Sequence, residues 1–143
     1  MQTEHIKAAC EAVVLAFFHA LDTRRHDAAA ALMAPDGTWL RQGQLLTGPR
    51  EVLAALEARA PQRTTCHVIT NLRLLEHSGS QAMVGYFLTA YDSDPQVQGG
   101  APRLVAIRDC QDRLVASGQD RLVASGQDWL LAEKRSRRHL PPE

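Results

Sequence analysis

Apolar residues have a helical spacing in the first part of the chain and alternate with polar residues in much of the second. In residues 3–21 apolar side chains recur every three or four positions, which predicts an amphipathic helix with Thr3 as its N-cap. The apolar residues of this stripe are Ile6, Cys10, Val13, Val14, Phe17, Phe18 and Leu21. A charged run at 22–27 interrupts the pattern, and a second short helix is expected over residues 28–33.

Turn-forming residues divide the remainder of the chain. Ala-Pro-Asp-Gly at 34–37 predicts a turn before a short strand at 38–41, and Thr47-Gly48-Pro49 predicts the start of a third helix that ends before Pro61. From residue 64 the period is two, which predicts four strands at 64–76, 81–92, 103–115 and 128–137, with a polar loop at 94–102. Helices followed by an antiparallel meander indicate an α+β fold.

The length of 143 residues corresponds to one domain, 1–143, and a hydrophobic content of 45% is typical of a globular chain. The 16 basic and 16 acidic residues cancel, so we expect neither nucleic acid nor an anionic membrane as a partner. No apolar run approaches the ~20 residues that cross a bilayer, and the first residues lack the pattern of a signal peptide. Cys10, Cys66 and Cys110 are expected to be buried thiols of a cytoplasmic protein.

The octapeptide QDRLVASG occurs twice without change, at 111–118 and 119–126. Because solenoids need several longer units, we interpret it as a local tandem duplication. If the last hairpin keeps the register of a single copy, paired residue numbers sum to about 245, with Cys110 opposite Arg135. A longer loop costs only about 0.6 kcal/mol per doubling of length, so we expect the extra copy to form an excursion between Ser117 and Gln127.

Asp22 and His67 are the candidates for chemistry. His67 lies in the strand sequence TTCHVITNLRL, where alternation places it on one face with Thr65, Ile69 and Asn71. Asp22 follows an apolar helical stripe, and a helix C-terminus is electrostatically unfavourable for an acid, so a buried His partner would explain it. Such a carboxylate fixes the imidazole tautomer and leaves the other nitrogen free to remove a proton. The alternatives are a solvated acid and a hydrogen-bonded core histidine.

Other classes of site lack their sequence patterns. No Gly-x-Ser-x-Gly elbow, paired metal-ligand spacing or phosphate-binding glycine loop occurs, so no metal and no cofactor are expected. The opposite face of the strand that carries His67 is too apolar for open water, which predicts a homo-oligomer, a dimer or trimer. The residues of that face are Cys66, Val68, Thr70, Leu72 and Leu74.

Two segments carry a resemblance to a known family. Residues 19–56 contain the pattern D-x-x-x-x-D from Asp22 to Asp27 and the pattern G-x-x-x-x-G-P from Gly43 to Pro49, and the strand at His67 reads H-x-x-x-N-x-R. With these motifs the chain resembles the SnoaL-like (nuclear-transport-factor-2-like) superfamily over nearly its whole length. The resemblance implies a cone-shaped, cystatin-like α+β barrel, with N-terminal helices packed on a curved, mainly antiparallel sheet.

Within this superfamily the pattern is most similar to the His–Asp dyad lyases, namely gamma-hexachlorocyclohexane dehydrochlorinase, scytalone dehydratase and bile-acid dehydratase. The resemblance implies that His67 is the general base, that Asp22 orients it, and that Lys134 stabilises an oxyanion or leaving group. The residues implied for the pocket lining are Phe17, Trp39, Tyr86, Leu88 and Ala90.

The implied function is that of a cofactor-free lyase or isomerase, which takes a proton from a small apolar or cyclic molecule. A non-catalytic ligand-binding domain, or a structural protein like the β subunits of ring-hydroxylating dioxygenases, is the alternative.

Overall fold

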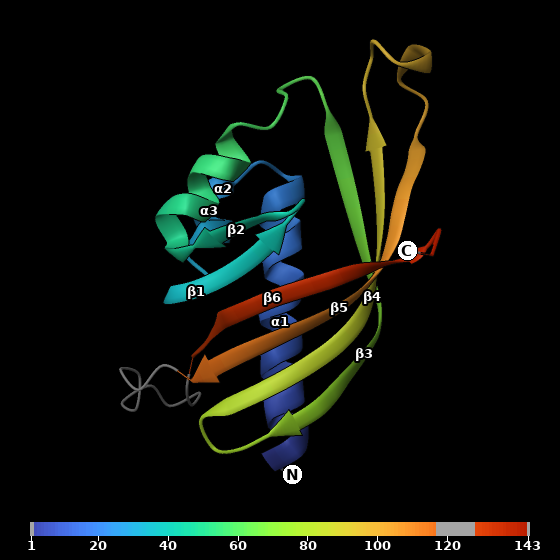
Figure 1. The fold of residues 1–143 in the computed structure, drawn as a ribbon. Coiled ribbons are helices and arrows are strands. Elements are labelled where there is room, and N and C mark those ends of the chain that lie inside the picture. Colours follow the sequence, from blue (N-terminus) through green and yellow to red (C-terminus); the bar gives the residue numbers. More distant parts are fainter. Residues whose placement is uncertain (1, 117–127, 143) are drawn as a thin grey trace.

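The computed structural model describes residues 2–116 and 128–142, which form helices packed on a single curved sheet (Figure 1). The helices are α1 (Gln2–Asp22), α2 (His26–Ala30) and α3 (Gly48–Glu57), with a 3-10 turn, η1 (Gln98–Gly100). The strands are β1 (Met33–Arg41), β2 (Gln44–Thr47), β3 (Thr64–His77), β4 (Gln81–Ser93), β5 (Arg103–Ala116) and β6 (Trp129–Leu140).

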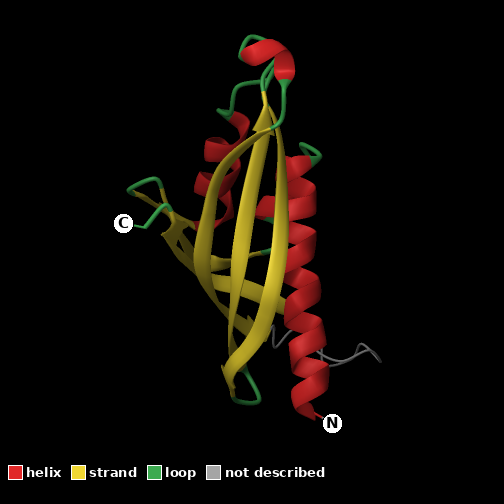
Figure 2. Ribbon diagram, turned by 90° about the vertical axis from the view of Figure 1, so that its right-hand side faces the viewer, coloured by secondary structure: helices red, strands yellow, loops and turns green. Residues whose placement is uncertain are grey.

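The strands are arranged in the order β2-β1-β6-β5-β4-β3. Every neighbouring pair is antiparallel except β1 and β6, which are parallel. Helix α1 lies along one face of the long strands, while α2 and α3 pack beside the end of the sheet that β1 and β2 form (Figures 1 and 2). The predicted α+β class, with N-terminal helices on a curved and mainly antiparallel sheet, is confirmed.

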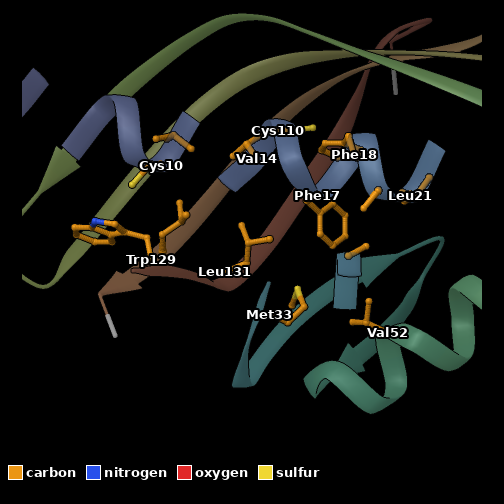
Figure 3. Packing of buried hydrophobic residues seen from close by; sticks show 14 of the residues in the cluster. Cys10, Val14, Phe17, Phe18, Leu21, Met33, Val52, Cys110, Trp129 and Leu131 are labelled. Atoms are coloured by element: carbon orange, nitrogen blue, oxygen red, sulfur yellow. The ribbon is translucent and has the colours of Figure 1, made fainter. Parts of the chain in front are cut away.

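The core lies between α1 and the sheet. The helical stripe predicted from the sequence is buried on its inner side, where Cys10, Val14 and Phe17 are 0% exposed and pack near residues such as Leu131 (Figure 3). Each fully buried large apolar side chain contributes about 1.5–3 kcal/mol. Helix α1 begins at Gln2, so Thr3 is not its N-cap, and the Thr3 hydroxyl lies 3.1 Å from Nε2 of His77.

The segment between the first helix and the third differs from the prediction. The second helix is shorter and earlier than expected, and the predicted turn at 34–37 is part of β1, at a place where the pairing with β6 is interrupted. Pro35 removes no ladder hydrogen bond there. Gly37 permits a close approach, because a Cβ atom would lie 2.5 Å from the carbonyl oxygen of Leu131. Strand β2, which the pattern did not predict, pairs with β1.

Strand β3 changes its inward face halfway along. Thr65, His67 and Ile69 point inward as predicted, but Asn71 is exposed and adopts a left-handed backbone conformation with φ of 55°. The register against β4 shifts at this point, so the strand has a bulge. After the bulge Leu72 and Leu74 pack against the core instead of the outer face. The prediction that Asn71 shares the face of His67, and Leu72 and Leu74 the opposite face, is therefore wrong.

The final hairpin keeps the predicted register near its tip. Ala116 lies opposite Trp129 and Leu114 opposite Leu131, so the ladder is not shifted by eight residues. Between Leu114 and Arg113 the ladder has a bulge, and on its far side Cys110 lies opposite Ser136 instead of Arg135. The predicted excursion at 117–127 lies outside the described residues.

The outer surface of the sheet carries several exposed apolar side chains, including Val68 at 41%, Tyr91 at 39% and Leu104 at 57%. Cys66 is also exposed, so it is not the buried thiol that was expected, whereas Cys10 and Cys110 are buried. Homo-oligomerisation through this surface stays a prediction. None of the described helices is long and apolar enough to span a membrane.

Candidate active site

Asp22 and His67 form the centre of the candidate site. Asp22 is the last residue of α1, and its side chain turns toward β3, where one carboxylate oxygen lies 2.6 Å from Nδ1 of His67. The same oxygen accepts a hydrogen bond from the Thr65 hydroxyl at 2.8 Å, and the other accepts one from the His67 backbone N–H at 2.7 Å. Both side chains of the pair are 15% exposed. The predicted proximity of the two residues is therefore confirmed.

The hydrogen bonds of Asp22 favour its ionised form and fix the tautomer of His67. Burial alone would raise the pKa of this carboxyl, but the hydrogen bonds and charge of His67 and the hydrogen bond from Thr65 outweigh it and hold the pKa below its usual value. An ionised carboxylate only accepts, so Nδ1 of His67 carries a proton and donates it. In the neutral imidazole the lone pair is then on Nε2, which bonds no residue in the described part of the chain.

A second polar group lies on the neighbouring strands β4, β5 and β6. Nζ of Lys134 donates to Oδ2 of Asp112 at 2.7 Å, and the Tyr86 hydroxyl donates to the same oxygen at 2.7 Å. The side chains of Lys134 and Asp112 are only 3% and 1% exposed. Burial, together with the charge of Asp112, raises the pKa of Tyr86 well above its ordinary value, so the phenol stays protonated. The ammonium also lies over the rings of Phe17 and Phe18, at 4.6 and 4.8 Å.

A cavity of about 450 Å³ connects the two polar groups. His67 lies on its wall, with the ring centroid 5.1 Å from that of Phe18, and Lys134 contacts the same phenyl ring. The residues implied from the sequence that line this cavity are Trp39, His67, Tyr86, Leu88, Ala90 and Lys134. Asp22 lies behind His67. The cavity therefore brings the dyad and the lysine to one volume.

Phe17 does not line the cavity. Its ring is 0% exposed and lies on the side of α1 that faces Met33 and Val52, edge-on to Trp39 at 5.4 Å (Figure 3). Successive helix residues point about 100° apart, and it is Phe18 that faces the cavity. The expectation of Phe17 as a lining residue is thus corrected to Phe18.

Two features of the site were not predicted from the sequence. The first is Asp112, which belongs to the first copy of the octapeptide. Its alternation with the inward residues Cys110 and Leu114 could have indicated that it is buried. The second is a set of arginines in the lining. They are Arg41, Arg59, Arg63, Arg108 and Arg135. Long flexible side chains from separate elements give no periodic signal, so only the folded chain brings them together.

Asp92, at the end of β4, holds one of these arginines. It is 4% exposed and accepts from Arg103 at 2.9 and 3.0 Å and from Arg63 at 2.7 Å. These hydrogen bonds, that from Arg103 first, hold its pKa below the usual value despite its burial. The carboxylate therefore positions the Arg63 guanidinium at the cavity.

The Asp92 ion pairs predict a pH-dependent contribution to stability. A carboxyl whose pKa is lower in the folded chain stabilises above its unfolded pKa of about 3.9, and this stabilisation disappears as pH falls through the folded pKa. We expect Asp92→Asn to cost about 1.5–3 kcal/mol at pH 7 and progressively less below pH about 4. Urea unfolding of both proteins across this range measures the difference, and a constant difference would contradict the ionised role of Asp92.

In residues 2–116 and 128–142, no three His, Cys, Asp or Glu side chains are grouped so that they could hold a metal ion.

Comparison with known protein families identifies the family of this chain. The profile of the SnoaL-like domain matches residues 3–133 of this chain. No curated protein sequence gives a significant match.

Solved structures of low sequence identity share the fold. A type 2 hexachlorocyclohexane dehydrochlorinase is 17% identical with a TM-score of 0.75, over 92% of this chain and 84% of its own. A ketosteroid isomerase-like protein from Erwinia carotovora atroseptica is 16% identical with a TM-score of 0.70, over 92% and 95% of the chains. A Nostoc punctiforme protein with a cystatin-like fold is 14% identical with a TM-score of 0.71, over 95% and 92%.

Proposed function

Because the chain belongs to the SnoaL-like domain family, we propose that it is a cofactor-free lyase or isomerase that removes a proton from a small cyclic substrate. The observation that carries this proposal is the 2.6 Å contact between Asp22 and Nδ1 of His67 at the wall of a cavity. One structural neighbour is named a dehydrochlorinase, and another is named ketosteroid isomerase-like. The first name corresponds to a lyase reaction and the second to an isomerase reaction.

In the proposed reaction the substrate places a C–H bond against Nε2 of His67. The proton moves to Nε2, and Asp22 stabilises the imidazolium that forms. In a lyase reaction the C–H electron pair becomes a double bond as the neighbouring leaving group departs with its own bonding pair. In an isomerase reaction the proton returns from the imidazolium to a different carbon of the same molecule.

Lys134 is proposed to act on the opposite side of the substrate. Its ammonium carries three protons, and Nζ donates one to Asp112 at 2.7 Å and one to the Tyr86 oxygen at 3.3 Å. We propose that it stabilises negative charge on a substrate oxygen or leaving group through the remaining proton. The low exposure of Lys134 strengthens such an interaction, because little water competes with it.

The dyad favours acid–base chemistry over covalent catalysis. In the described part of the chain no hydroxyl or thiol is bonded to Nε2 of His67, as a nucleophile activated by a histidine would be. The ordinary alternative, a non-catalytic binding domain, has no need for a free imidazole nitrogen at the cavity wall.

Deuterium exchange tests the proposal before the natural substrate is known. We expect the wild-type chain in D₂O to exchange or eliminate a carbon-bound proton in at least one member of a panel of cyclic ketones, a ketosteroid and hexachlorocyclohexane. Mass spectrometry measures deuterium uptake, and an ion-selective electrode measures released chloride. His67→Ala should abolish the reaction, while His5→Ala on the exposed side of α1 should not. A panel that gives no reaction, or equal rates for wild type and His67→Ala, would contradict the proposal.

A further inference from the structure

Three arginines from separate parts of the chain meet at the cavity. Arg41 is the last residue of β1, Arg59 follows α3, and Arg63 precedes β3. All three line the cavity and none of them is fully exposed. The same lining includes Thr65 and His67, the proposed general base.

The three guanidinium groups differ in their partners. Arg59 donates to the Thr65 hydroxyl at 2.7 Å and to the Leu21 carbonyl at 3.3 Å. Arg63 donates to Asp92 at 2.7 Å. Arg41 makes neither a hydrogen bond nor an ion pair with any described residue, and its guanidinium lies 5.6 Å from the centre of the Trp39 ring. Contact with a rigid indole orients this group, while its N–H donors stay available.

The positive charges of these arginines repel one another at the cavity. Burial lowers the pKa of Arg41, and so does the charge of Arg63; burial and the charges of Arg24, Arg63 and Arg41 lower the pKa of Arg59. The nearby carboxylates already have partners, since Asp22 is bound by His67 and Asp92 is shared by Arg63 and Arg103. An anion in the cavity would relieve this repulsion.

We propose that Arg41, supported by Arg59 and Arg63, binds a carboxylate group of the substrate. A planar guanidinium matches a carboxylate through two parallel hydrogen bonds. Of these three arginines, Arg41 is the one whose N–H donors have no partner among the described residues, because Arg59 and Arg63 already donate to oxygen atoms of the protein. A carboxylate needs only one such guanidinium for two parallel hydrogen bonds, so we assign a carboxylate to Arg41.

The remainder of the cavity suits an apolar ring system. Phe18, Leu88, Ala90 and Val105 provide aromatic and aliphatic surface in the same lining. This inference rests on the proposed function and refines it: the substrate is a cyclic carboxylic acid, held at its acid group while a C–H bond of the ring system lies at His67. Arg41 is then a residue for binding and orientation, separate from the proton transfer.

Matched pairs of acids and amides test the carboxylate site directly. We would titrate benzoate, 2-naphthoate and anthracene-2-carboxylate, each with its neutral carboxamide, into the protein by isothermal calorimetry. At least one acid should bind about tenfold or more tightly than its amide, because a hydrogen-bonded charge pair distinguishes the two. Raising NaCl from 0.05 to 0.5 M should weaken binding of the acid and leave binding of the amide unchanged.

Variants separate this site from the dyad. Arg41→Gln should remove the preference for the acid, whereas Arg50→Gln, an exposed arginine of α3, should keep it. His67→Ala should also keep it, so failure of catalysis and failure of acid binding are distinguishable. The proposal is wrong if no acid of the panel binds more tightly than its amide, if salt has no effect on that preference, or if Arg41→Gln retains it.

Discussion

Replacing His67 with alanine is expected to lower the rate of proton abstraction by about 10²–10⁴-fold, the usual contribution of a positioned general base. The imidazole is the only group of the dyad at the cavity wall, because Asp22 lies behind it. Its loss leaves the cavity and the buried Lys134–Asp112 pair in place. We therefore expect the loss to appear in kcat more than in KM, measured with any substrate that the exchange panel identifies.

Asp22→Asn should lose nearly as much activity, for a different reason. An amide is uncharged, so it stabilises the imidazolium less and no longer enforces the tautomer with the proton on Nδ1. Thermal unfolding and circular dichroism must accompany this variant, since Asp22 also accepts from Thr65 and from the His67 backbone. A folded His67→Ala or Asp22→Asn protein with full turnover would show that the proton is removed elsewhere.

The dyad could be predicted from the sequence because each member violates a local rule. An acid at a helix C-terminus is unfavourable, and a histidine among inward strand positions needs a partner. Helical and strand periods then place both side chains on core-facing surfaces. The period of two also predicted the inward positions of Thr65 and Ile69 on β3. It failed at Asn71, because a bulge moves the following residues to the other face and no local pattern marks it.

The Lys134–Asp112 pair could not be predicted, because a one-residue register error hides it. The expected pairing of residues summing to about 245 places Lys134 opposite Gln111. In the structure an extra residue of β6, between Glu133 and Leu131, changes the pairing so that Asp112 lies opposite Lys134. The resemblance implied a cation that stabilises an oxyanion or leaving group, and the structure adds that Asp112 already pairs with this lysine.

The arginines at the cavity could not be predicted for a different reason. Arg41, Arg59 and Arg63 come from a strand end and from the segment between α3 and β3, where no periodicity constrains direction. Their long side chains reach the cavity through tertiary packing alone. As a result, the sequence predicted an apolar cavity, while the structure has an apolar surface with a cationic wall.

Stability should depend strongly on the pair between β5 and β6, and Asp112→Asn is expected to cost about 3–5 kcal/mol. The substitution leaves the Lys134 ammonium, 3% exposed, without its counter-ion at 2.7 Å. Urea unfolding followed by circular dichroism measures the free energy of unfolding. Tyr86→Phe is the matched control, because it removes one neutral donor to the same carboxylate oxygen and leaves the ion pair, so it should cost less, about 1.5–3 kcal/mol.

The double variant Asp112→Leu with Lys134→Met distinguishes a charge effect from a packing effect. Replacement of both ions by apolar side chains of similar size removes the uncompensated charge, so this protein should recover most of the stability that Asp112→Asn loses. Recovery would show that folding does not need the ion pair. If the free energy of unfolding of Asp112→Asn is instead within about 1 kcal/mol of the wild-type value, water must reach Lys134. The proposed interaction of Lys134 with a substrate oxygen would then be weak as well.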